Sequence, residues 1–124
     1  MPVTTPLLHL ATSAQWRACL DTGVIAPSVA EFVHLSTPEQ VALPASRIFP
    51  GHPDLLLLVL HPDRITADVR WEAGLPTDPP EMRFPHAYGS IPTSAVLAAL
   101  PYRPREDGGF DPPELPSTVA TLGR

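Results

Sequence analysis

The sequence contains no lysine, a single cysteine and no long apolar run. All eight basic residues are arginine, and 13 acidic residues bring the formal net charge to −5. A nucleic-acid backbone is bound through clustered basic residues that release its counterions. We therefore expect no nucleic-acid partner, although an arginine can still hold a carboxylate or a phosphate of a small ligand.

The lone Cys19 excludes an intramolecular disulfide, and we expect it to be a buried helix residue rather than a reactive thiol. The longest apolar run, residues 55–60, is far too short to cross a bilayer. We expect a cytoplasmic protein with no membrane partner.

Hydrophobic residues make up 44% of the 124-residue chain and charged residues 17%, enough apolar material for one core. Aromatic residues are few, so aliphatic side chains must dominate the packing. After Pro101 the chain becomes rich in proline and glycine and loses its apolar periodicity. We predict one α+β domain over residues 1–101 and a loosely ordered tail over residues 102–124.

Two helices are indicated by capping patterns. Residues 12–15 form a capping box, and Gly23 predicts the end of that helix, with Trp16, Cys19 and Leu20 on one face. A second helix is predicted to open at residues 37–40, and Pro44 is expected to end or bend it early.

Strands are predicted from short apolar or alternating runs. Residues 7–11 and 32–36 each suit a short strand, and residues 55–60 suit a central strand covered on both faces. Residues 69–72 alternate, so Arg70 and Glu72 would share the face opposite Val69 and Trp71. Residues 73–81 must be a loop, which could serve as a mobile flap, whereas residues 91–100 fit either a helix or a strand.

Five histidines are present, and two of them, His52 and His61, precede proline in turns and are expected to be solvated loop residues. His9, His34 and His86 fall within predicted strands or a proline-containing motif, where a polar ring must find partners. Together with Ser36, Arg70 and Glu72 they supply a base, a hydroxyl, a guanidinium and a carboxylate. Each of these residues also has a purely structural interpretation, such as an exposed ion pair between Arg70 and Glu72.

Several site types lack their motifs. No HxH, HExxH or CxxC spacing supports a metal site, so none is predicted. No GxSxG elbow supports a serine hydrolase, and neither GxGxxG nor a phosphate-binding loop is present.

Four motifs, read in order, resemble an uncharacterised bacterial family known as domain of unknown function 952. The resemblance spans residues from about 7 to 101, and the ordered set is far more specific than any single motif. The motifs are Leu-His-Leu-Ala-Thr at 8–12, Phe-Val-His-Leu-Ser-Thr at 32–37, Arg-Trp-Glu at 70–72 and Phe-Pro-His-Ala-Tyr-Gly at 84–89.

The resemblance implies an ADP-ribosyltransferase-like fold, in which a small, bent and split β core with two flanking helices holds NAD between two small sheets. It implies that His9 contacts the adenosine ribose and that Ser36 with Thr37 organises the nicotinamide pocket. Glu72 would hold the nicotinamide ribose and favour an oxocarbenium-like transition state, unless His86 or Tyr88 takes that role.

The remaining roles complete the predicted cleft. Arg70 is expected to face a phosphate, and Tyr88 is expected to contact the nucleotide. His34, Glu72 and His86 are the predicted catalytic residues. We expect an enzyme that binds NAD or another ADP-ribose-containing nucleotide, and the alternative is a non-catalytic domain that uses the same cleft for a small metabolite.

Overall fold

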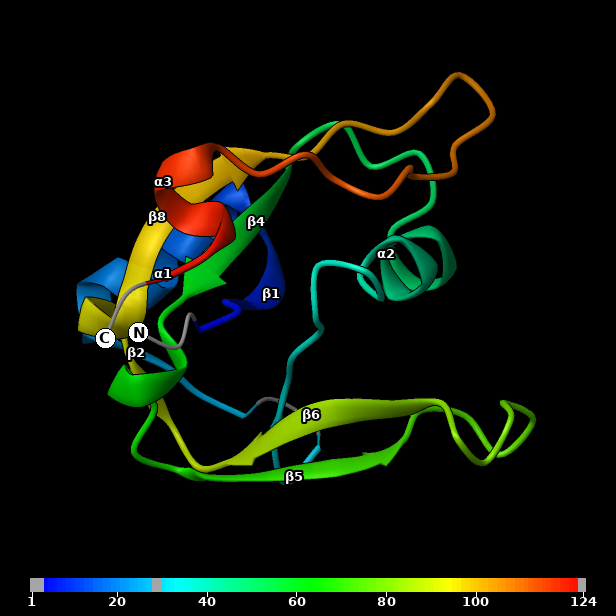
Figure 1. Cartoon of the computed structure of the whole chain (residues 1–124). Helices are drawn as coiled ribbons and strands as arrows, with labels where there is room; N and C mark the ends of the chain where they lie inside the picture. The colour runs from blue at the N-terminus through cyan, green and yellow to red at the C-terminus, as the bar shows by residue number, and fades with distance from the viewer. Residues whose placement is uncertain (1–3, 28–29, 123–124) are drawn as a thin grey trace.

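A computed structural model describes residues 4–27 and 30–122 (Figure 1). Within these ranges no helix is long and apolar enough to cross a membrane. The elements, in chain order, are β1 (Leu7–Thr12), α1 (Ser13–Thr22), β2 (Val24–Ile25), β3 (Val33–His34), α2 (Ala42–Ile48), β4 (Leu55–Leu60), the 3-10 turn η1 (Pro62–Arg64), β5 (Asp68–Ala73), β6 (Arg83–Tyr88), β7 (Ile91–Pro92), the 3-10 turn η2 (Thr93–Ala95), β8 (Val96–Pro101) and α3 (Ser117–Ala120).

The first sheet has the antiparallel order β1-β4-β8, with the predicted central strand in its middle. Leu58 and Leu60 belong to the core cluster on one face of the sheet, whereas Leu55, Leu57 and Val59 belong to the cluster on the other. Successive residues of a strand point to opposite faces, so an unbroken apolar run is what a doubly covered strand requires. The prediction for residues 55–60 is confirmed.

The first helix follows its capping pattern. The Thr12 hydroxyl accepts from the Gln15 amide at 3.1 Å, and the Gln15 side chain accepts from the Thr12 amide at 2.9 Å. Gly23 ends the helix in the left-handed region at φ 83°. One detail differs, because Leu20 is 54% exposed instead of packing with Trp16 and Cys19 against the core.

The second helix begins later than predicted. Residues 38–41 form a turn, in which the Gln40 amide donates to the Thr37 carbonyl at 3.1 Å, and α2 starts only at Ala42. Pro44 therefore lies in the first turn of α2, where an amide has no acceptor within the helix. The proline that was expected to end this helix is tolerated at its start.

The second sheet has the antiparallel order β3-β6-β5 and joins the first sheet through a short stretch of backbone. The Leu35 amide donates to the Pro85 carbonyl at 3.0 Å. One residue later, Ser36 and Leu8 exchange two backbone hydrogen bonds of 2.7 and 2.8 Å. Residues 33–36 thus have β6 on one side and β1 on the other, and the β core divides into these two three-stranded sheets and a two-stranded sheet of β2 and β7.

The segment over residues 91–100, for which helix and strand were both open, forms β7, η2 and β8. Strand β8 pairs with β4 along most of its length, and a bulge near Leu60 shifts the register. Pairing with a long neighbouring strand decides between the two interpretations, which the apolar pattern alone does not separate.

The segment after Pro101 packs on the sheet, in contrast to the loosely ordered tail that we expected. Tyr102, Phe110 and Val119 are buried in the second core cluster, beside α2 and the outer face of β4. Leu122 and Thr4 exchange backbone hydrogen bonds of 2.7 Å. Isolated apolar residues separated by prolines leave no periodic pattern in the sequence, yet their side chains are buried. Residues 123–124 lie outside the described residues.

Replacing Phe110 by alanine tests this packing. Phe110 is only 3% exposed, so we expect Phe110→Ala to lower the free energy of unfolding by about 3 to 5 kcal/mol, measured by urea denaturation. The matched control is Leu20→Ala at the exposed position in α1, which should change the free energy of unfolding by less than about 0.5 kcal/mol. Equal effects of the two substitutions would contradict the packed tail.

Candidate functional site

One face of the β3-β6-β5 sheet carries most of the predicted site residues. His34 pairs across strands with His86, and His86 pairs with Arg70, so the three residues form a row across the sheet. Glu72 and Tyr88 lie two residues along from members of this row and therefore share their face. The opposite face bears Val69 and other apolar residues of the first core cluster.

The Glu72 carboxylate is the centre of this face. Its Oε1 accepts a hydrogen bond of 2.6 Å from the Tyr88 hydroxyl and one of 2.9 Å from the His86 Nδ1. These two bonds, the Tyr88 bond first, hold the pKa of Glu72 below its ordinary value. Within the described chain Oε2 has no hydrogen-bond partner, and the side chain is 38% exposed. Glu72 is therefore an ionised carboxylate with one oxygen free to bind a ligand.

His86 is held in one orientation. Its side chain is only 5% exposed and its Nδ1 donates to Glu72, so the lone pair in the uncharged form of the ring is on Nε2. Its ring stacks on Phe32 with centroids 4.0 Å apart, and its centroid lies 5.4 Å from that of the more exposed His34. Burial and the nearby His86 lower the pKa of His34. A neutral, accessible His34 ring can accept a proton.

Phe32 is a site residue that sequence reasoning did not single out. Besides stacking on His86, its ring lies 4.8 Å from the His34 ring and 5.2 Å from the Tyr88 ring, between centroids. The signal was its position two residues before His34, which places both side chains on one face of an extended segment. Phe32 excludes water from one side of His86.

Arg70 lies over the ring of Tyr88, with its Cζ 4.3 Å from the ring centroid. Its Nε donates to Asp68 at 2.8 Å, so the exposed ion pair of Arg70 is with Asp68 and not with Glu72. The hydrogen bond to Glu72 raises the pKa of Tyr88, which keeps the phenol protonated as a donor.

His9 lies where the two sheets separate. Its Nδ1 is 2.7 Å from the His34 carbonyl, which can only accept, so Nδ1 carries the proton. Burial lowers the pKa of His9 and keeps the ring neutral. Beyond the Leu8–Ser36 pair, the His34 carbonyl accepts from the His9 side chain instead of from a backbone amide of β1. His9 thus terminates the pairing between the sheets, and its ring contacts the backbone of His34.

The remaining predicted residues, Ser36 and Thr37, lie elsewhere. Ser36 is buried at the backbone pair with Leu8, and Thr37 lines a hollow together with Trp71. Trp71 and Glu72 are consecutive residues of β5 and point to opposite faces. The residues that were predicted to line a single cleft therefore lie on both sides of the second sheet.

The other two histidines stabilise turns. His52 Nδ1 accepts from the Asp54 amide and His61 Nδ1 from the Asp63 amide, each at 3.2 Å. Both lie in loop segments as expected. Across residues 4–27 and 30–122, no three His, Cys, Asp or Glu side chains are grouped to hold a metal ion.

These hydrogen bonds predict a division of histidine tautomers. His9 and His86 donate through Nδ1 and should be Nδ1–H tautomers when neutral, whereas His52 and His61 accept at Nδ1 and should be Nε2–H tautomers. Long-range ¹H–¹⁵N correlation spectra at pH 7.5 distinguish the two forms. Finding His9 in the Nε2–H form would contradict its placement between the sheets.

Removing the Tyr88 hydroxyl should raise the pKa of Glu72. The folded-state pKa lies below the ordinary 4.5, so this carboxylate stabilises the fold above that pH and the contribution is lost as pH falls through the folded value. In Tyr88→Phe the ¹³C titration of Glu72 should move toward 4.5. Acid unfolding should also begin at a higher pH. Tyr102→Phe is the control, because the Tyr102 hydroxyl donates to the Asp111 carbonyl instead; an equal shift in both variants would contradict the assignment.

Comparisons with known proteins agree with the fold. The crystal structure of protein CC0527 from Caulobacter crescentus is 28% identical, and the match covers 86% of this chain and 94% of that chain with a TM-score of 0.74. For the solution NMR structure of CC0527 the identity is 28%, the coverage 87% and 93%, and the TM-score 0.71. No curated protein matches the chain. These structures support a small α+β fold.

The family profile described as protein of unknown function (DUF952) matches residues 10–99. This range contains β3, β5 and β6, and it begins one residue after His9. It includes every residue of the face that carries Glu72, here called the Glu72 face: Phe32, His34, Arg70, Glu72, His86 and Tyr88. The chain therefore belongs to the DUF952 family, as its four ordered motifs predicted.

Proposed function

We propose that this protein is a small enzyme that cleaves the nicotinamide–ribose bond of NAD, or the matching bond of another ADP-ribose-containing nucleotide. We further propose that its split β core is of the ADP-ribosyltransferase-like type. The observation that carries the proposal is the Glu72 carboxylate, with both internal hydrogen bonds on Oε1 and with Oε2 open to a ligand.

The charge of Glu72 suits this chemistry. When the C–N bond breaks, the bonding electron pair leaves with the nicotinamide nitrogen, and positive charge develops on the ribosyl C1′ and its ring oxygen. A fixed carboxylate nearby stabilises that charge without reorganising during the reaction. The lowered pKa of Glu72 keeps it ionised at neutral pH, whereas a general acid would need a raised pKa.

Oε2 supplies the orientation. A ribose hydroxyl that donates to Oε2 would hold the sugar against the carboxylate, and the bonds from His86 and Tyr88 keep Oε1 from rotating into its place. His86 and Tyr88 are positioning residues in this scheme. The stacked Phe32 locks His86 in turn.

His34 is placed to accept a proton. It is exposed, its pKa is lowered, and it lies beside His86 on the same face. An acceptor hydroxyl or a water molecule would attack C1′ from the side of His34 and lose its proton to the neutral His34 ring. The proton released by the attacking group is thereby taken up, and the reaction balances. Arg70, whose Nε is held by Asp68, directs its remaining donors to solvent, where they can meet a phosphate.

A second function, non-catalytic binding of a small metabolite, is favoured by one observation. The hollows lined by Thr37 with Trp71 and by Gln40 with Phe84 do not include Glu72, His86 or Tyr88. A ligand bound in either hollow would be away from the Glu72 carboxylate, as non-catalytic binding requires.

Nicotinamide release tests the enzyme proposal. With NAD as substrate, Glu72→Gln keeps the shape and an accepting oxygen but removes the charge, so we expect the rate to fall by about 100-fold or more. Glu81→Gln in the exposed 74–82 loop is the matched control and should retain the wild-type rate. No release by the wild-type protein, or equal rates for wild type and Glu72→Gln, would refute the enzyme. Thermal stabilisation by ADP-ribose without any release would establish the binding function instead.

A further inference from the structure

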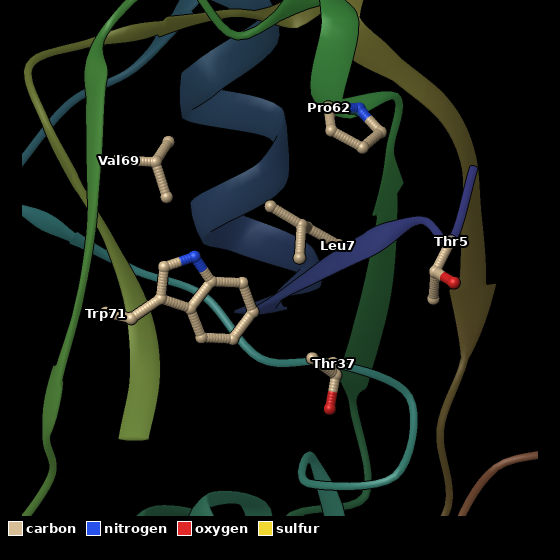
Figure 2. Close-up of a pocket in the computed structure, with 6 residues that line it drawn as sticks. All are labelled: Thr5, Leu7, Thr37, Pro62, Val69 and Trp71. Carbon is tan, nitrogen blue, oxygen red and sulfur yellow. The ribbon is translucent and has the colours of Figure 1, made fainter. Parts of the chain in front are cut away.

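A hollow of about 330 Å³ opens between the two sheets, on the side of β5 away from Glu72. Figure 2 shows Trp71 reaching from β5 toward Leu7 of β1, with Thr37 on the far side. The volume lies at the lower end of small-molecule sites, which span about 300 to 1,000 Å³. It suits one ring system with a short substituent. Its lining consists of Thr5, Leu7, Thr37, Pro62, Val69 and Trp71.

Trp71 is the unusual member of this lining. It is 48% exposed, although its neighbours on the same side, Val69 and Leu7, pack in or against the first core cluster. Strand β5 is at the edge of its sheet, where exposed apolar surface favours aggregation and is usually avoided. A large exposed indole beside a concave apolar surface is typical of a ligand site.

The chemistry of the lining selects the ligand. Among the residues that the structure describes, no charged side chain lines it, so a charged group would lose hydration there without compensation. Leu7, Val69 and Pro62 supply apolar contact, and the indole offers a flat π surface for stacking. The hydroxyls of Thr5 and Thr37 can each donate or accept a hydrogen bond, which suits the heteroatoms of a ring.

We propose that this hollow binds one flat, uncharged heteroaromatic ring, stacked on the indole of Trp71 and hydrogen-bonded at its edge by Thr37. The site does not depend on the chemistry proposed for Glu72, because the two side chains leave β5 on opposite faces. A ligand long enough to pass around the edge of β5 could reach both sites.

Indole N–H signals in ¹H–¹⁵N spectra test the site. The chain has two tryptophans, Trp16 in α1 and Trp71, and the Trp71→Phe spectrum assigns them. Titration with adenine and with nicotinamide should shift the Trp71 signal saturably and leave the Trp16 signal in place. Cyclohexanol, an aliphatic ring, is the ligand control and should give no saturable shift.

Two variants separate this site from the Glu72 face. Thr37→Val keeps the side-chain shape and removes the hydroxyl, and it should weaken ring binding about three- to tenfold. Glu72→Gln should leave ring binding unchanged even if nicotinamide release is lost. No saturable shift with either ring, an equal response to cyclohexanol, or loss of ring binding in Glu72→Gln would each overturn the proposal.

Discussion

The structure depends on the double backbone hydrogen bond between Leu8 and Ser36. These two residues hold the β1-β4-β8 sheet against the β3-β6-β5 sheet, and beyond them the strands diverge. A carbonyl that no longer faces a strand is open to a donor from a side chain, because a backbone carbonyl is a strong acceptor. His9 supplies that donor to His34, and so a side chain, not a strand, marks the line along which the β core divides.

This division gives the second sheet two unlike faces. One face joins the first core cluster, apart from the edge where Trp71 borders the hollow. The other carries Glu72 with its donors His86 and Tyr88, and Phe32 covers the buried imidazole. Alternation along β5 alone separates a carboxylate suited to charge stabilisation from an indole suited to ring stacking. The two proposed sites are thus independent consequences of one edge strand.

Much of this arrangement was predictable from local patterns. The box at Thr12 and Gln15 specified the start of α1, and the run over residues 55–60 specified a doubly covered strand. The α2 region was less predictable, since Thr37 and Gln40 carry a capping pattern that a turn satisfies equally well. The packing of the tail was not predictable from the apolar pattern, because Phe110 is an isolated buried residue with no periodic neighbours.

The sequence by itself determined which side chains share a face, because the two-residue period of a strand is a local property of the backbone. It therefore placed Arg70 with Glu72, and it supplied the ordered motifs that identify the family. Only the tertiary structure decided which strands are neighbours, and hence that His86 and Tyr88 donate to Glu72 while Thr37 lies with Trp71. Those contacts join residues far apart in the chain, and strand pairing depends on how the whole core packs, which no local pattern records.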